Sequence, residues 1–143
     1  MTIARIIESR PPADIVSCEA QNTVEEAARL LAARRIGAMP VYEGGRIAGI
    51  FSERDLLYSI ARDGPAALER RVGEVMTAPA FTVERETDVI EALSLMTRRR
   101  IRHLPVEQDG AMIGFVSIGD LVKHRIELIE SEAEQMREYI RMA

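Results

Sequence analysis

The spacing of apolar positions changes along the chain between the alternation typical of strands and the three-to-four-residue spacing typical of helices. Each change marks a predicted element. The pattern predicts a strand, a helix, two strands and a second helix, at residues 14–18, 23–35, 38–42, 47–51 and 52–62. The same order returns downstream, from a short strand predicted at 81–83. Strands and helices that alternate in this way indicate the α/β (α+β) class.

Turn and cap residues support this assignment in both halves. Gly44-Gly45 and Asp109-Gly110 each separate two apolar runs, and both pairs are typical of tight hairpin turns because their residues tolerate positive φ. Two capping boxes are predicted from a cap residue followed three positions later by a glutamate, at Thr23 with Glu26 and at Asp88 with Glu91.

An internal repeat relates the two halves. Residues 16–57 align without a gap to residues 81–122, and 15 of the 42 aligned positions are identical. Duplicated units of this size usually bury their apolar faces against each other. We therefore expect two βαββα units with a shared interface, a first unit at 1–63 and a second at 72–124, joined by a linker at 64–71.

Residues 125–143 are predicted to form a C-terminal amphipathic helix. Its apolar stripe begins in the second unit and advances in steps of four and three residues, through Val122, Ile126, Ile129, Ala133, Met136 and Ile140. Such a stripe needs a cover, because an isolated helix would expose it to water. The cover is either the chain's own domain or a second copy, and we favour the second copy, which predicts a homodimer.

Composition narrows the classes of partner. A net charge of −4 argues against nucleic acid, which requires a basic face to neutralise phosphates. No apolar run approaches the length of a membrane span, and the first residues lack the pattern of a signal peptide. The single cysteine, Cys18, has no partner for an internal disulfide. We therefore expect a cytoplasmic protein that binds neither membrane nor nucleic acid.

Catalytic and metal-binding patterns are missing from the sequence. Two histidines, His103 and His124, and one cysteine form no cluster with the spacing of metal ligands. Neither a nucleophile elbow, a phosphate-binding loop nor a dinucleotide fingerprint is present. Together with the duplication, this favours binding over catalysis, so no enzyme activity and no catalytic cofactor are expected.

The most specific motif is Ser-x-x-Asp at the start of a predicted helix in each unit. Ser52 and Asp55 form the first copy, and Ser117 and Asp120 form the second. Free N–H groups at a helix N-terminus attract oxygen-rich ligands, and the carboxylate can accept bonds from two vicinal hydroxyls. The same pattern also describes an ordinary helix cap. Both roles are compatible, because a cap leaves part of the polar capacity unused.

A basic pair distinguishes the two units. Arg102 and His103 lie where the second unit turns from helix to strand, and they are candidates to hold a phosphate. The first unit has Gly37 and Ala38 at these positions. If both units bind a ligand, the two sites are therefore expected to differ.

The chain resembles the cystathionine-β-synthase (CBS) domain family. Each unit carries a hydrophobic-proline step, Met39-Pro40 or Leu104-Pro105, followed by Gly-hydrophobic-x-Ser-x-x-Asp. Two such units in one chain resemble a Bateman module, and the resemblance covers about residues 2–122. It implies pseudo-twofold packing of the units through their sheets, with two clefts that bind adenosine nucleotides.

The resemblance also implies which residues contact the ligand. They are Ser17, Gly37, Met39, Pro40, Ser52, Arg54, Asp55, Thr82, Arg102, His103, Leu104, Pro105, Ser117 and Asp120. The motif serines and aspartates would hold ribose hydroxyls, and the residues around the prolines, with Ser17 and Thr82, would line the adenine slot. Arg54, Arg102 and His103 would meet phosphate, so the site that contains Arg102 is expected to be the tighter one.

By this resemblance, the chain is expected to be a regulatory module for sensing energy state or metabolites. It would bind AMP, ADP or ATP, with NAD or S-adenosylmethionine as further candidates, and would signal to a partner protein through a change of conformation. The alternative is a structural dimerisation or adaptor module whose clefts bind nothing.

Overall fold

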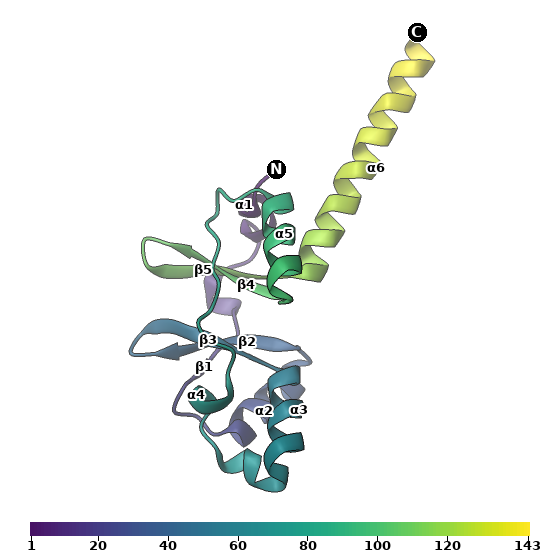
Figure 1. Cartoon of the computed structure of the whole chain (residues 1–143). Helices are drawn as coiled ribbons and strands as arrows, with labels where there is room; N and C mark the ends of the chain where they lie inside the picture. Colours follow the sequence, from purple (N-terminus) through teal and green to yellow (C-terminus); the bar gives the residue numbers. More distant parts are fainter.

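The computed structural model describes residues 1–143, and the predicted order of elements is present twice (Figure 1). The first half and the connection contain α1 (Ile3–Ile7), the 3₁₀ turn η1 (Pro12–Asp14), β1 (Cys18–Glu19), α2 (Val24–Arg34), β2 (Ala38–Glu43), β3 (Arg46–Ser52), α3 (Glu53–Asp63) and the 3₁₀ turn η2 (Gly64–Glu69). The remainder contains α4 (Val72–Val75), α5 (Val89–Arg99), β4 (His103–Gln108), β5 (Ala111–Ser117) and α6 (Ile118–Met142).

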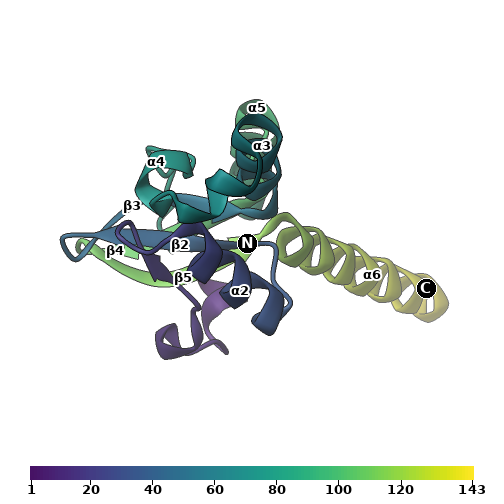
Figure 2. The same ribbon diagram turned by 90° about the horizontal axis from the view of Figure 1, so that it is seen from below.

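Two small sheets form the centre of the molecule. In the first, β1 runs parallel to β2 and β2 runs antiparallel to β3, whereas the second is the antiparallel hairpin β4–β5. The two sheets are stacked, with α2, α3 and α4 on the outer side of one and α1 and α5 on the outer side of the other (Figures 1 and 2). The fold is thus a mixed α/β pair of repeats with a long C-terminal helix.

The predicted strands at 14–18 and 81–83 are much shorter in the structure. In the first unit η1 occupies residues 12–14, and only Cys18 and Glu19 pair with β2. In the second, only Val83 bridges to Val106, through bonds to the backbone of Pro105 and Glu107. Both segments were predicted from β-rich composition, but each has pairing partners for only one or two residues.

Both hairpin turns were predicted correctly. Gly44 and Gly45 have φ of 60° and 78°, and Asp109 and Gly110 have φ of 52° and 80°. Positive φ at both central residues is the geometry that such two-residue hairpins require. The register shifts at equivalent places in the two hairpins, between Val41/Tyr42 and between Val106/Glu107, so the repeat extends to irregularities of the backbone.

Helix caps follow the prediction in part. The Thr23 side chain accepts the N–H of Glu26 at 3.1 Å and caps α2, but Glu26 accepts the Thr23 hydroxyl and not its N–H, so the predicted box is incomplete. The box predicted from Asp88 to Glu91 is wrong, because Asp88 caps α5 through the N–H of Ile90. Complete capping boxes form instead at the starts of α3 and α6, at the two Ser-x-x-Asp motifs.

Two separate hydrophobic cores stabilise the units, and each contains a segment from the other half of the chain. The first core holds residues from α2, β2 and β3 together with Val72 of α4. The second holds residues from α5, β4, β5 and α6 together with Ile3, Ile6 and Ile7 of α1. The two leading helices thus exchange units, since α1 packs in the core of the second unit and α4 in the core of the first.

Backbone hydrogen bonds fix this exchange. The N–H of Ile3 donates to the carbonyl of Thr87 at 2.9 Å, next to α5. The N–H of Val72 donates to the carbonyl of Asn22 at 2.8 Å, next to α2. The apolar spacing of the two leading helices predicted buried faces, but that spacing does not determine which core receives them.

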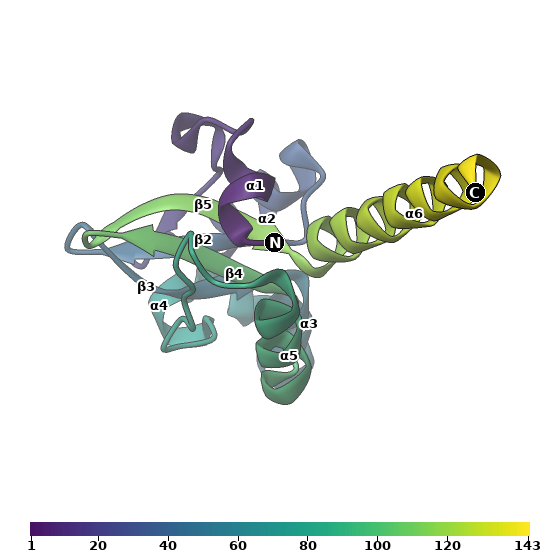
Figure 3. The ribbon, with the colours of Figure 1, turned by 90° about the horizontal axis from the view of Figure 1, so that it is seen from above.

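Helix α6 continues from the second unit without a break at residue 124 (Figures 1 and 3). Leu121 is buried in the second core, whereas the C-terminal part of the helix projects away from the body of the molecule. Five apolar residues of its predicted stripe are at least 42% exposed, namely Val122, Ile126, Ile129, Met136 and Ile140. None of the helices is long and apolar enough to cross a membrane.

Candidate ligand-binding cleft

A cavity of about 420 Å³ lies between the two units, and both units contribute to its wall. It is lined by Ser9, Arg10, Pro11, Asp14, Ile15, Val16, Ile36, Gly37, Ala38, His103, Phe115, Ser117 and Asp120. Ligand pockets commonly have volumes of about 300–1,000 Å³, with apolar walls and a few convergent polar groups. We call this cavity the Asp120 cleft.

The polar end of the Asp120 cleft is the start of α6. Ser117 ends β5 and caps the helix, accepting the N–H of Asp120 on its Oγ at 3.1 Å. Asp120 returns a bond, because its Oδ2 accepts the N–H of Ser117 at 2.8 Å. The motif thus acts as a helix cap in this structure, and it also presents a hydroxyl and a carboxylate to the cavity.

Arg10 forms an ion pair with Asp120 in the cleft. Its Nη1 donates to Oδ2 of Asp120 at 3.0 Å and its Nη2 donates to Oδ1 at 2.8 Å, which makes a two-pronged ion pair. Burial tends to raise the pKa of Asp120, but hydrogen bonds from Arg10 and Ser117 outweigh it and keep the pKa below the ordinary value. The carboxylate is therefore charged at neutral pH.

His103 begins β4 and forms part of the side wall. Its ring stacks on Phe115, with centroids 5.4 Å apart and planes inclined by 15°. Burial lowers the pKa of His103 below 6.5, and the negative charge of Asp120 opposes this shift only in part. A neutral imidazole on an aromatic ring gives the wall a flat, weakly polar surface.

The first Ser-x-x-Asp motif has the same local geometry but a different third partner. Asp55 Oδ2 accepts the N–H of Ser52 at 2.9 Å and its hydroxyl at 3.1 Å. Asp55 Oδ1 accepts the hydroxyl of Thr77 at 2.9 Å. We call these three residues the Asp55 half-site, and none of them lines the Asp120 cleft or the second cavity described next.

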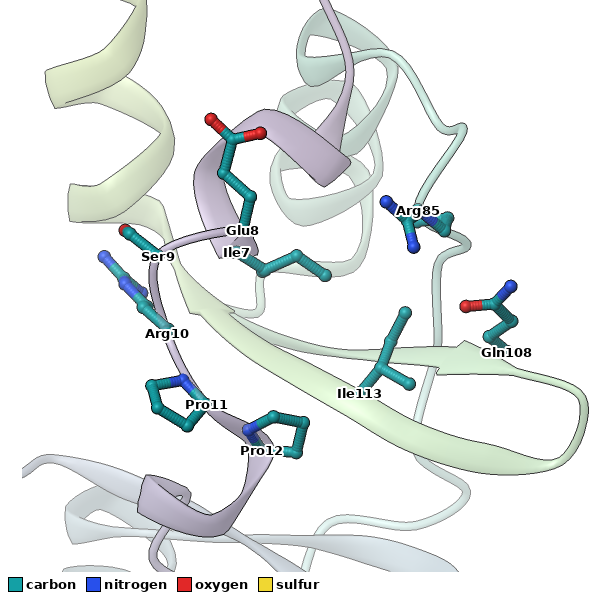
Figure 4. Close-up of a pocket in the computed structure, with 9 residues that line it drawn as sticks. All are labelled: Ile7, Glu8, Ser9, Arg10, Pro11, Pro12, Arg85, Gln108 and Ile113. Carbon is teal, nitrogen blue, oxygen red and sulfur yellow. The ribbon is translucent and has the colours of Figure 1, made fainter.

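A second cavity, of about 330 Å³, shares residues 9–11 with the Asp120 cleft (Figure 4). It is lined by Ile7, Glu8, Ser9, Arg10, Pro11, Pro12, Arg85, Gln108 and Ile113. Figure 4 shows the side chain of Arg10 directed away from Arg85. The two arginines therefore do not form one basic cluster, and Arg10 serves the Asp120 cleft.

Four of the predicted ligand-binding residues are brought together by the structure, Gly37, His103, Ser117 and Asp120. Met39 and Leu104 are fully buried in the two cores and line neither cavity. Pro40 and Pro105 are buried beside them, and Ser17 is half-buried next to Val16 of the cleft wall. Thr82, Arg54 and Arg102 are exposed and line neither cavity.

Sequence reasoning missed Arg10, which supplies a cation to the wall that contains Gly37 and Ala38. Those two positions lack the basic pair of the second unit, and that absence pointed away from phosphate binding in this cleft. Arg10 lies outside the aligned repeat, so the comparison of the two units gave no signal for it.

The single cysteine of the chain lies outside both cavities. The Cys18 thiol lies in the first core, and burial raises its pKa to about 11, so it stays protonated at neutral pH. The structure contains no group of three or more His, Cys, Asp or Glu side chains that could hold a metal ion.

Comparison with known proteins decides the family. The model of the CBS domain matches residues 7–62 and again residues 72–127. The chain belongs to the CBS domain family. It carries two CBS domains in tandem, as the repeated motifs indicated.

Individual relatives agree with this. The chain is 38% identical over 128 residues to the CBS domain-containing protein CBSX3, mitochondrial, of Arabidopsis thaliana, covering 86% of this chain and 62% of CBSX3. The chain therefore spans less than two thirds of that relative. A solved protein with CBS domains from Burkholderia ambifaria superposes with a TM-score of 0.82 at 39% identity, covering 89% of this chain and 95% of that one.

Two more distant structures share the fold. CBSX2 in complex with AMP has a TM-score of 0.75 at 23% identity and covers 89% of this chain and 97% of its own. The CBS domain pair of MJ0100, in complex with 5′-methylthioadenosine and S-adenosyl-L-methionine, has a TM-score of 0.74 at 20% identity. It covers 86% of this chain and 94% of its own.

Proposed function

We propose that this chain is a regulatory module that binds an adenine nucleotide in the Asp120 cleft. The observation that carries the proposal is the convergence, in one cavity between the units, of an apolar wall, a carboxylate at a helix start and an arginine. The CBSX2 and MJ0100 structures, which hold AMP and adenosine derivatives, support the same ligand class. The proposed activity is binding, not catalysis.

Each part of a nucleotide has a matching surface. The apolar side chains of Val16, Ile36 and Phe115 line the cavity and suit an adenine ring, because they offer it a wall from which water is excluded. Ser117 and Asp120 offer a hydroxyl and a carboxylate to the ribose hydroxyls. Arg10 is the group suited to a phosphate.

Ligand binding at this place would affect the relation between the two units. Gly37 and Ala38 belong to the first unit, whereas Ser117 and Asp120 belong to the second. A ligand that contacts both favours the arrangement in which it fits best, and it shifts the equilibrium only by its difference in affinity. A partner protein that recognises one arrangement would read this change.

A thermal-shift series tests the proposal. The protein is heated with AMP, ADP, ATP, NAD, S-adenosylmethionine or adenosine, each over a range of concentrations. At 100 times its dissociation constant, a ligand that binds only the folded state adds about 2.7 kcal/mol to the free energy of unfolding. A folded protein whose melting temperature responds to none of these compounds would contradict the proposal and leave the adaptor function as the better account.

The exposed stripe of α6 supports the second element of the proposal, a homodimer. The stripe repeats in steps of four and three residues, which is the spacing of a helix that pairs with another helix. Leu57 on α3 is 64% exposed, and it occupies the position in the first unit that Val122 occupies in the second. In a twofold dimer the same surface of each chain meets its copy, so the stripe of one α6 would pack against the other chain.

Light scattering after size-exclusion chromatography tests the homodimer with two variants. Ile129→Glu places a charge in the centre of the stripe, and Ser131→Glu places the same charge on the opposite face of α6. We expect Ile129→Glu to be monomeric and Ser131→Glu to keep the mass of two chains. Equal masses for both variants would exclude the stripe as the interface.

A further inference from the structure

The Asp120 carboxylate has too little free capacity to hold a ribose while Arg10 remains bound. A charged carboxylate offers about four lone-pair positions, two on each oxygen. Oδ2 accepts from both Arg10 and Ser117, and Oδ1 accepts a second bond from Arg10. Only one position on Oδ1 is left, whereas two vicinal hydroxyls need two acceptors. Both vicinal hydroxyls of a ribose can therefore bind this carboxylate only after Arg10 leaves.

The charge balance of the cleft determines which ligands can displace Arg10. Arg10 is the only lysine or arginine that lines the cavity, and two carboxylates, Asp14 and Asp120, face it from η1 and α6. His103 adds no permanent positive charge, since burial lowers its pKa. A ligand without an anionic group offers the displaced guanidinium no partner in place of Asp120, whereas a phosphate provides it with a new two-pronged partner.

We infer that Arg10 makes the Asp120 cleft selective for adenine ligands that carry a phosphate, by exchanging Asp120 for that phosphate when the ribose binds. The inference rests on the proposed function and specifies the ligand class of the same cleft. It makes adenosine and other adenine ligands without phosphate poor ligands of this cleft.

The position of Arg10 allows such an exchange. The side chains of Arg10 and Asp120 are 45% and 25% exposed, and ion pairs that reach solvent are held more weakly than fully buried ones. Residues 8–11 connect α1 to η1, and the N–H of Arg10 donates to the carbonyl of Ile7 at 2.9 Å. The guanidinium can therefore turn while the backbone stays attached to α1.

Isothermal titration calorimetry with AMP and with adenosine tests the inference on three proteins. They are the wild type, Arg10→Gln and the control Arg85→Gln, which removes the same charge from the wall of the neighbouring cavity. We expect the wild type and Arg85→Gln to bind AMP at least about tenfold more tightly than adenosine, a difference of about 1.4 kcal/mol. In Arg10→Gln, AMP should bind more weakly and adenosine more tightly, so that the ratio falls about tenfold.

An unchanged ratio in Arg10→Gln would overturn the inference, and continued binding of AMP in that experiment would leave the proposed function intact. No binding of either compound to the wild type would instead contradict the proposed function itself. A further variant, Arg10→Lys, keeps the charge but cannot engage both carboxylate oxygens in a fork. Adenosine should bind to it more tightly than to the wild type, and adenosine binding as weak as in the wild type would also overturn the inference.

Discussion

The Asp55 half-site and the Asp120 cleft each contain a copy of the Ser-x-x-Asp motif, and the two aspartates have different partners beyond the motif. Both have a serine that caps a helix and an aspartate that bonds back to the serine N–H, at 2.9 Å in the first and 2.8 Å in the second. The outer face of the first carboxylate accepts a neutral hydroxyl from Thr77. The outer face of the second accepts the guanidinium of Arg10.

This difference arises outside the part of the chain that repeats closely. Thr77 follows α4, which packs with the first unit, and Arg10 follows α1, which packs with the second. Each leading segment therefore contributes a side chain to the motif of the unit that it joins. The duplicated core preserves the geometry of two sites, and the exchanged segments give each site its own chemistry.

The largest expected effect comes from truncating a side chain with which an exchanged helix fills a core. Ile3 is fully buried in the second core, so Ile3→Ala should lower the free energy of unfolding by about 2–5 kcal/mol. Hydrogen exchange should show the loss of protection in β4 and β5, although Ile3 lies in the first half of the chain. Val72→Ala, the equivalent change in α4, should instead affect β2 and β3. Loss of protection in the opposite units would contradict the exchange.

A smaller effect is expected at two glycines, one in β3 and one in β5, that lie against the segment after α4 and against α1. A Cβ added at Gly49 would lie 2.6 Å from the carbonyl oxygen of Thr77, whereas one at Gly114 would lie 2.8 Å from a methyl group of Ile7. A backbone atom yields less readily than a side chain. Urea denaturation should therefore show a loss of about 1–3 kcal/mol for Gly49→Ala and a smaller loss for Gly114→Ala. The reverse order would show that the Ile7 side chain resists displacement more strongly than the backbone at Thr77.

The smallest expected effect is a pH dependence of the free energy of unfolding that arises from His103. The first unit has Ala38 at the equivalent position, which cannot titrate. The pKa of His103 is lowered by burial in the folded protein, so the unfolded chain binds more protons between this value and 6.5. Stability that is present above pH 6.5 should decrease as the pH falls toward the lowered pKa. Urea denaturation between pH 7.5 and 5.5 should show this decrease, and His103→Gln should reduce it. Equal slopes for the two proteins would contradict a neutral, buried imidazole.

Much of the fold could be predicted because local chemistry determines it. Gly44-Gly45 and Asp109-Gly110 fix the hairpins through φ, and the 65-residue repeat predicts a second copy of each element. Packing of α1 into the second core could not be predicted, since the apolar face of Ile3, Ile6 and Ile7 fits either core by composition.

The candidate site was predictable to a similar extent. The Ser-x-x-Asp motifs indicated where two helix starts present a hydroxyl and a carboxylate, and Ser117 and Asp120 do line the cleft. Arg10 was not predictable, because its contact with Asp120 joins residues 110 positions apart and depends on the exchange of α1. A single arginine before two prolines carries no local signal for such a contact.

The most direct test of the account is a crystal structure of the chain grown with saturating AMP. We expect the nucleotide in the Asp120 cleft, with the ribose on Asp120, the adenine against the apolar side chains, and Arg10 turned from Asp120 to the phosphate. A cleft without nucleotide, in which Arg10 still holds both oxygens of Asp120, would contradict it.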